Sequence, residues 1–366
     1  TGFSYLAFSM QQLLVSWLLI GVLLLPADNV GTLQALIGLP GIVLMLWGGA
    51  SADRNDPRSM LLAVYALTPL LTLFLIGIDQ SVGLSMWSVL IWAVGMSVAM
   101  SWSTPAQQAI LNRVSGPAVQ QGVSAATAVN FLVQITGLAI AGQMERIGLS
   151  TVLAIQGASL LVAAYMMRRI PAAPGAASSP GGSPLANIAE GLKATYADRT
   201  IFSVLSLNFA SAIFNAGSFM TVLPFIVKRV YEGDAVTLAL VMVVFYIGAT
   251  ASNLVMFRLM PFARPGRLFL SMQLTRAAIV LLIWIEPSWP VFLLALFAWG
   301  VNMGFTTTLT RAMVQESARP EFRGRILSVL TLGMMGSAPL GAILLGFLIE
   351  RFGTLQALLP LSLIHI

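Results

Sequence analysis

Long apolar runs, separated by short polar breaks, recur along almost the whole chain. A transmembrane helix needs about 20 consecutive, mostly apolar residues. Of the 366 residues, 58% are hydrophobic and 9% are charged, whereas about a quarter of the residues in a soluble domain are charged. Soluble globular classes are therefore excluded, and we expect an all-α polytopic membrane protein. Eleven clear spans and part of a twelfth are predicted, at residues 3–25, 31–50, 60–78, 84–104, 123–143, 149–167, 201–226, 236–257, 268–285, 290–310, 326–348 and from 354 onward.

Arginine and lysine gather in one alternate set of the predicted loops. Cytoplasmic loops retain an excess of these residues. The pattern predicts a bacterial inner (plasma) membrane protein with both termini in the cytoplasm, and it explains the formal net charge of +6 without a nucleic-acid partner. The richer set holds Arg54, Arg58, Arg113, Arg168, Arg169, Lys193, Arg199, Arg258, Arg264, Arg267, Arg311, Arg319, Arg323 and Arg325, and the other set holds Arg146, Lys228, Arg229 and Arg351.

Both ends of the sequence look truncated. Thr1 leads directly into an apolar run, and no charged segment marks a signal peptide. The final six residues, 361–366, match the translation of a common transposase sequencing adapter in one reading frame. We therefore expect incomplete first and last helices, and we expect residues 361–366 with the single histidine to be an artefact of read-through.

One long polar segment divides the chain into residues 1–170, a linker at 171–200, and residues 201–366. The first part of the linker is rich in Pro, Gly, Ser and Ala, which is typical of a flexible tether. Its second part can form a short helix with Leu185, Ile188 and Leu192 on one face. This part either lies as a helix at the cytoplasmic membrane interface or stays disordered.

The two sides of the linker resemble each other. A parallel duplication of a six-helix unit explains such a repeat, because an even number of spans returns the chain to the same side of the membrane. The sequence thus predicts two six-helix bundles. The matching positions are Thr104 with Thr308, Ser124 with Ser328, Gly137 with Gly341, Gly142 with Gly346, and MERIG with IERFG.

The loop GGASADRNDPRS, residues 48–59, resembles motif A of the major facilitator superfamily through Gly48, Asp53, Arg54 and Arg58. The segments TPAQQAIL from Thr104, EGL at 190–192 and RGRILS at 323–328 are similar to the branch of enterobactin-type siderophore exporters and macrolide efflux proteins. The resemblance implies the major facilitator fold with 12 transmembrane helices. It also implies alternating access and energy from the proton motive force.

The resemblance further implies that Asp53 faces the positive N-terminus of the eleventh span. That span begins at Arg323 and Arg325, so the three side chains would form a conformational latch. A plain hydrophilic turn that follows the positive-inside rule remains the alternative. The glycines of the fifth and eleventh spans, Gly137, Gly142, Gly336, Gly341 and Gly346, are expected to be helix-packing contacts, because small residues let helices approach closely in lipid.

In this superfamily the first, fourth, seventh and tenth helices line the central cavity. Uncharged amides beside aromatic surfaces suit an amphiphilic organic molecule, although each residue alone fits interhelical packing equally well. The candidates in these spans are Gln11, Gln12, Trp92, Asn208, Asn215, Trp299 and Asn302.

Arg276 is the only ionisable residue predicted inside a span. It either extends back to the cytoplasmic interface or binds an anionic group or a coupling carboxylate in a polar interior. Asp28, near the outer end of the first helix, is a candidate proton carrier.

These features predict a secondary transporter that exports small drug-, macrolide- or siderophore-type molecules. An uptake carrier and a transport-dead membrane sensor of the same fold are the alternatives. Enzyme signatures such as H-E-x-x-H are absent from the sequence, so we expect no catalytic residues, no metal and no cofactor. The expected partners are the substrate, protons and the lipid bilayer, with the protein acting as a monomer.

Overall fold

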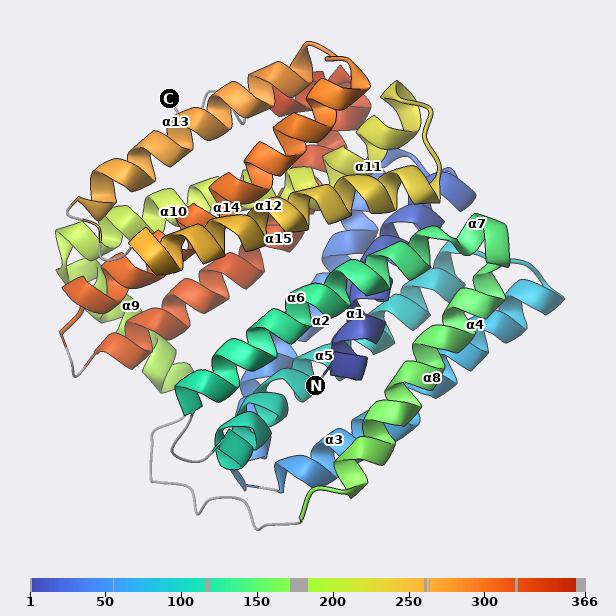
Figure 1. The fold of residues 1–366 in the computed structure, drawn as a ribbon, viewed down its shortest axis with the longest axis horizontal. Helices are drawn as coiled ribbons and strands as arrows, with labels where there is room; N and C mark the ends of the chain where they lie inside the picture. The colour runs from blue at the N-terminus through green and yellow to red at the C-terminus, as the bar shows by residue number, and fades with distance from the viewer. Residues whose placement is uncertain are drawn as a thin grey trace. The chain divides into compact units, whose positions relative to one another are not determined.

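The computed structural model describes residues 2–54, 56–115, 119–171, 184–259, 262, 264–319 and 322–359. Side chains at 45–54, 112, 115, 119–125, 127–128, 131, 184–187 and 257 lie outside this description. The described chain is almost wholly helical and contains no strand (Figure 1). Ten of its helical segments are long and apolar enough to cross a membrane, which confirms the all-α polytopic fold.

The helices of the first half follow the predicted spans. The segment 3–25 ends in a π-helical turn, and the third span is divided at Thr68 because Pro69 starts a new helix. The elements are α1 (Gly2–Trp17), η1 (Leu18–Val22), α2 (Ala27–Arg54), α3 (Pro57–Leu67), α4 (Pro69–Ser81), α5 (Met86–Ser115), α6 (Val119–Gly142), α7 (Met144–Ile147) and α8 (Leu149–Arg168).

The second half begins with the linker helix. The second part of the linker is helical, which agrees with the first of its two interpretations. Residues 172–183 lie outside the described residues. The elements are α9 (Pro184–Ala197), α10 (Arg199–Gly217), η3 (Ser218–Val222), α11 (Leu223–Phe225), η4 (Ile226–Val230), α12 (Ala235–Leu259), α13 (Pro265–Trp284), α14 (Trp289–Ser317), α15 (Arg323–Phe352) and the 3₁₀ turn η5 (Gln356–Leu358). The expected artefact at 361–366 lies outside the described residues.

Backbone geometry repeats between the two halves. Every described residue with positive φ has a counterpart in the other half. The two members of each pair lie in the turns that follow matching helical segments. A non-glycine residue rarely adopts this conformation, so the shared positions support the predicted duplication. The pairs are Leu24 (51°) with Glu232 (51°), Gly83 (86°) with Glu286 (53°), and Gly148 (85°) with Gly353 (100°).

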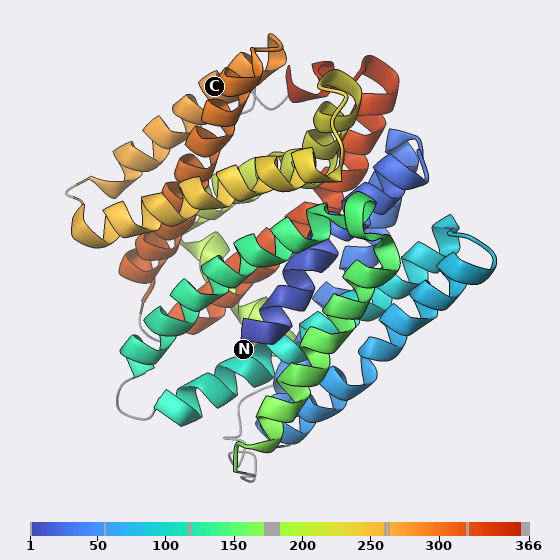
Figure 2. The ribbon, with the colours of Figure 1, turned by 45° about the vertical axis from the view of Figure 1, so that its right-hand side comes forward.

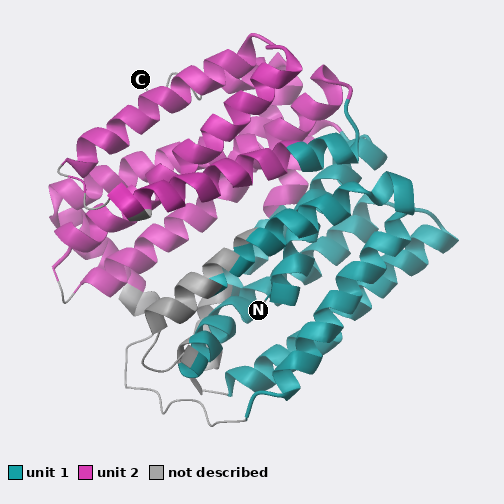
Figure 3. Cartoon of the chain, in the orientation of Figure 1, with its two compact units in different colours: residues 1–25, 36–181, 233–240 teal, residues 26–35, 182–232, 241–366 magenta. Residues whose placement is uncertain are grey.

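The chain forms two compact units that exchange short segments between the sequence halves (Figure 3). Unit 1 consists of residues 1–25, 36–181 and 233–240, and unit 2 consists of residues 26–35, 182–232 and 241–366. The first turns of α2 therefore belong to unit 2, and the first turns of α12 belong to unit 1. Pro40 lies inside α2, shortly after the point where the helix passes into unit 1.

Within unit 1, α1 packs on α6 and α4 packs on α8, and the latter pair lies side by side in Figure 1 and in Figure 2. Within unit 2, α10 packs on α15. Glycine permits the closest of these approaches: a Cβ added at Gly341 would lie 2.0 Å from the Ile213 carbonyl oxygen, and one at Gly137 would lie 2.9 Å from the Leu6 carbonyl oxygen. The predicted packing role is confirmed at these two duplicated positions.

Candidate functional site

The faces of α10 and α14 in unit 2 are joined by a ladder of polar side chains. The Trp299 indole nitrogen donates to Asn215 Oδ1 at 2.7 Å. Two turns away along α10, Asn208 Oδ1 accepts from the Thr310 hydroxyl at 3.1 Å. Helical spacing places Asn208 and Asn215 on one face of α10, because residues seven apart return to the same side. Three residues predicted as separate cavity candidates thus form parts of one interhelical array.

Arg276, from α13, forms the centre of this ladder. Its Nε donates to Asn302 Oδ1 at 2.8 Å, one terminal nitrogen donates to Ser211 Oγ at 2.7 Å, and the other donates to Thr306 Oγ1 at 2.8 Å. The side chain is 3% exposed, so it does not extend to an interface. Among the described residues no carboxylate pairs with it. The guanidinium is therefore a buried cation held only by neutral acceptors.

Neighbouring groups fix the orientation of Asn302, which accepts the Nε proton. Its amide nitrogen donates to the Met272 carbonyl oxygen and to Thr275 Oγ1 at 2.9 Å. The amide oxygen is consequently the atom that faces Arg276. The sequence identified Arg276 and Asn302 but missed Ser211 and Thr306, because hydroxyl groups in apolar helices give no signal that separates a functional partner from a backbone-bonded one.

An aromatic cluster adjoins the Trp299 end of the ladder. The Phe219 and Phe245 rings lie 4.3 Å apart, and Phe245 meets Trp299 edge to face at 5.7 Å. Trp299 is 2% exposed. These rings place a rigid apolar surface directly beside the Asn215 amide.

The unit 1 candidates occupy a less saturated environment. Gln156 of α8 is fully buried, and its Nε2 donates to the Ala7 carbonyl oxygen at 2.9 Å and to Gln11 Oε1 at 3.4 Å. Gln11 Nε2, Gln156 Oε1 and Trp92 Nε1 have no hydrogen-bond partner within the described part of the chain. Gln12 is half-buried on the same helix as Gln11. Buried polar atoms of this kind usually bind water or a ligand.

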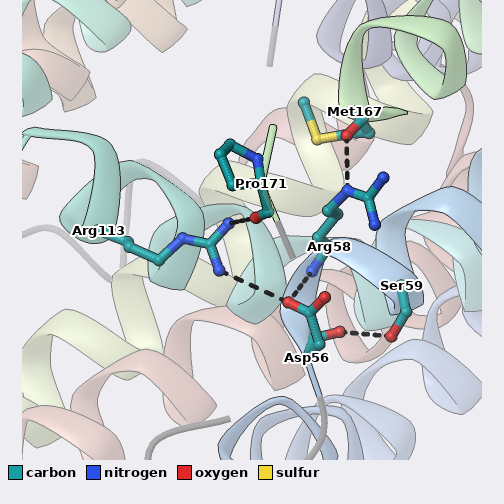
Figure 4. A network of polar contacts seen from close by, with 6 residues as sticks. All are labelled: Asp56, Arg58, Ser59, Arg113, Met167 and Pro171. Atoms are coloured by element: carbon teal, nitrogen blue, oxygen red, sulfur yellow. Dashed lines mark hydrogen bonds and ion pairs between the residues drawn. The ribbon is translucent and has the colours of Figure 1, made fainter. Parts of the chain in front are cut away.

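The motif A loop meets the ends of α5 and α8 in unit 1 (Figure 4). Arg58 donates from Nε to the Met167 carbonyl oxygen at 3.1 Å. Asp56 caps α3 by accepting from the Arg58 amide, and it pairs with Arg113 at 3.6 Å. Arg113 also donates to the Pro171 carbonyl oxygen at 2.8 Å. These contacts define the arginine-rich end of unit 1.

Sequence reasoning missed Asp56, although an Asp-Pro pair at the start of a helix is a recognised capping signal. Of the other latch candidates, Gly48, Asp53 and Arg54 lie in the last turns of α2. Their side chains lie outside the described residues, so the predicted Asp53 latch stays a prediction.

In unit 2, α9 is held against the start of α15. Arg325 pairs with Glu190 at 2.6 Å. A Cβ added at Gly191 would lie 2.6 Å from the Arg325 carbonyl oxygen, so only glycine allows this approach. The EGL and RGR segments therefore form one contact, while the Arg323 side chain is exposed.

At the opposite end of unit 2, the exchanged segment 26–35 binds to α15 and η3. Glu350 accepts from the Ala27 amide at 3.1 Å, at the N-terminus of α2. Gln34 accepts from the Thr221 hydroxyl at 2.5 Å and donates to the Met220 carbonyl oxygen at 2.9 Å. Asp28 is exposed in the first turn of α2, where it accepts from the Asn29 amide. A carboxylate at a helix N-terminus, the arrangement predicted for Asp53, is thus found at Glu350.

In unit 1, the helical part of the exchanged segment 233–240 begins at an Asp234 cap. Asp234 accepts from the Thr237 amide at 2.8 Å and from the Thr237 hydroxyl at 2.6 Å. The hydroxyl hydrogen bond is the main reason why the pKa of Asp234 lies below its ordinary value. A Cβ added at Gly142 would lie 2.4 Å from the Ala239 Cβ, just as one at Gly346 would lie 2.5 Å from the Ala27 carbonyl oxygen in unit 2. This duplicated glycine pair therefore receives the exchanged segments in both units.

Solved structures of membrane transporters share this fold. A bacterial homologue of the human lysosomal transporter Spinster matches with a TM-score of 0.74 at 16% identity, over 96% of this chain and 81% of that chain. A variant of the nucleoside transporter NupG matches with a TM-score of 0.76 at 13% identity, over 100% of this chain and 96% of that chain. A D-xylose-proton symporter gives 0.70 at 12% identity, over 100% and 95%. The fold class is that of the major facilitator transporters.

Sequence comparison gives the family. The sequence profile of the transmembrane secretion effector family matches residues 1–364, and the chain belongs to this family of the major facilitator superfamily. It is therefore a multi-pass membrane protein and a secondary transporter. A staphyloferrin A transporter of Staphylococcus aureus is 23% identical over 331 residues, which cover 87% of this chain and 80% of that protein.

Proposed function

We propose that the protein exports small amphiphilic molecules of the siderophore, drug or macrolide type by alternating access, driven by the proton motive force. The observation that carries this proposal is the ladder between α10 and α14. It combines amides, a buried guanidinium and an aromatic cluster, so it offers apolar contact together with a few orienting polar groups. The description of the family as secretion effectors supports the outward direction, and the staphyloferrin A transporter supports a siderophore-type substrate.

The proposed orientation has the arginine-rich end in the cytoplasm, because cytoplasmic loops retain basic residues. The termini then lie on that side of the bacterial inner membrane. Asp53, Arg323 and Arg325 belong to the same proposal as a latch that forms when the cytoplasmic side closes. Asp53→Asn should change transport and the populations of the two conformers, and unchanged values of both would exclude the latch.

Arg276 is proposed as the site that binds an anionic group of the substrate or a coupling carboxylate. Its burial without a carboxylate partner among the described residues supports this role, because an isolated charge inside a membrane protein is expensive and usually functional. Asp28, in the first turn of α2, is proposed as a proton carrier. Unchanged proton coupling in Asp28→Asn would remove it.

A panel of drug susceptibility and siderophore efflux assays tests the direction. Cells that carry the gene should accumulate less of at least one panel compound than cells that lack it, and Arg276→Ala should diminish this difference. Likeness to the D-xylose-proton symporter favours an uptake carrier as the second candidate. Nutrient import without any drug or siderophore phenotype would replace export by uptake, and equal accumulation with and without the gene would favour a transport-dead sensor.

A further inference from the structure

Unit 2 contains a groove of about 440 Å³ that the ladder does not fill. Helix α9 lines one side of it with Leu192 and Tyr196, α10 lines the next side with Phe202 and Phe209, and α15 lies opposite. Small-molecule pockets typically enclose about 300 to 1,000 Å³ and are mostly apolar. The groove therefore has the size and the surface of a site for one compact apolar group.

Two glycines of α15 create the room in this groove. A Cβ added at Gly336 would meet nothing within 4 Å, and one at Gly333 would meet only the Phe209 ring, at 3.4 Å. Both glycines line the groove. The close glycine contacts of the bundle permit helices to approach each other, whereas Gly336 leaves space that no described side chain occupies.

One amide connects the groove to the ladder. Asn208 lines the groove, and its Oδ1 accepts from the Thr310 hydroxyl. Thr310 also donates to the Thr306 carbonyl oxygen at 2.8 Å, and the Thr306 hydroxyl accepts from Arg276. The apolar surface of the groove therefore ends at the Asn208 amide, which belongs to the hydrogen-bond network of Arg276.

The linker helix is held in place as a wall of the groove. The Glu190 ion pair with Arg325 and the close approach at Gly191 fix α9 on α15. At the junction between α9 and α10, the Tyr196 and Phe202 rings lie 5.1 Å apart. These contacts give α9 a defined position beside the groove.

We propose that this groove binds the uncharged ring or alkyl part of the transported molecule, with α9 as a wall of the binding site and Asn208 as its hydrogen-bonding partner. The inference rests on the proposed function, since it names the part of an amphiphilic substrate that unit 2 recognises. It also gives the linker helix a part in substrate binding. Lipid acyl chains share the same chemistry, and the experiment separates the two sources.

The first test uses the sequence's lack of cysteine. In the full-length protein in detergent, Gly336→Cys supplies a single thiol inside the groove. Nile red, an uncharged aromatic amphiphile, should slow the reaction of this thiol with N-ethylmaleimide about tenfold when present at about ten times its dissociation constant. Gly324→Cys is the matched control, because Gly324 lies on the same helix, also has open space at its Cβ, and is outside the groove.

Slowing of the Gly336→Cys reaction alone supports the proposal, in detergent and again in phospholipid nanodiscs. Equal slowing at both positions, or none at Gly336→Cys, overturns it. A thiol that reacts slowly in nanodiscs without dye, and quickly in detergent, identifies a lipid chain as the occupant and overturns the assignment to substrate.

The second test fills the groove. Gly336→Leu should lower efflux of an exported panel compound at least about fivefold, which corresponds to about 1 kcal/mol, while Gly77→Leu in α4, outside the groove, retains it. The thermal unfolding midpoints of both variants should not fall below that of the parent, because neither new Cβ meets a neighbour within 4 Å and leucine favours a helix more than glycine does. Unchanged efflux in Gly336→Leu overturns the groove proposal. If the parent exports nothing, the proposed function fails, and the thiol protection still decides whether the groove binds an amphiphile.

Discussion

Replacing Arg276 by methionine separates its contribution to stability from its contribution to transport. Arg276→Met removes the three hydrogen bonds to Asn302, Ser211 and Thr306, which at about 1.5 kcal/mol each, because the donor is charged, sum to about 4.5 kcal/mol. It also removes a charge whose burial at the centre of a membrane helix costs about 3 kcal/mol. These opposing contributions are similar in size. We therefore expect the free energy of unfolding to fall by no more than about 2 kcal/mol.

Transport should respond differently. Because the proposed role of the Arg276 charge is to bind an anionic group, Arg276→Met should lower efflux at least about tenfold, the equivalent of about 1.4 kcal/mol. Arg276→Lys is the matched control: it keeps the charge but loses the planar fork that reaches three acceptors, and it should retain part of the efflux. Unfolding in detergent and efflux per folded molecule are the two measurements.

The opposite pattern would refute this reasoning. If Arg276→Met lost more than about 3 kcal/mol of stability while efflux per folded molecule stayed normal, the guanidinium would be a structural strut. Its burial without a carboxylate would then say nothing about substrate charge.

Three further predictions concern the bundle contacts. Gly341→Val should destabilise unit 2 by about 3 kcal/mol, because its Cβ would lie 2.0 Å from a backbone oxygen; thermal unfolding against Gly324→Val checks this, and equal midpoints would contradict it. Glu350→Ala should speed hydrogen exchange of the first amides of α2, consistent with a loss of about 0.3 to 1 kcal/mol, whereas exchange equal to that of the parent would exclude the contact. The lowered pKa of Asp234 means that its stabilising contribution is present above the ordinary value of 3.8 and is lost as the pH falls from there through the lowered pKa. Asp234→Asn should abolish this part of the acid dependence of unfolding, and an unaltered profile would exclude it.

Much of the fold followed from hydrophobic spans alone, because a membrane-spanning helix must satisfy its backbone internally and therefore leaves a long apolar run. The duplication was visible in glycines such as Gly137 and Gly341, and the structure shows why: their backbones meet the neighbouring helix directly. The π-helical end of α1 and the exchange of segments between units were not predicted. They depend on packing between helices, and the local apolar pattern is the same with or without them.

The site was predicted unevenly. Arg276 stood out because a charge in an apolar span is rare, and the amides of α10 and α14 stood out for the same reason. Their hydroxyl partners and the capping role of Glu350 remained hidden, since Ser, Thr and a carboxylate at the end of a span are common in membrane helices; the capping role of Asp56 was signalled by its Asp-Pro pair but was missed. The groove beside α9 depends on what surrounds Gly336, and a sequence does not show which glycine faces empty space.

Pro40 removes one backbone hydrogen bond inside α2. The proline has no amide hydrogen to donate to the carbonyl oxygen one turn earlier, at Leu36, and its ring pushes that carbonyl aside. Leu36 is also the residue at which α2 passes from unit 2 to unit 1. We therefore expect α2 to bend most easily close to the residue at which it passes from unit 2 to unit 1, because one backbone hydrogen bond is missing there.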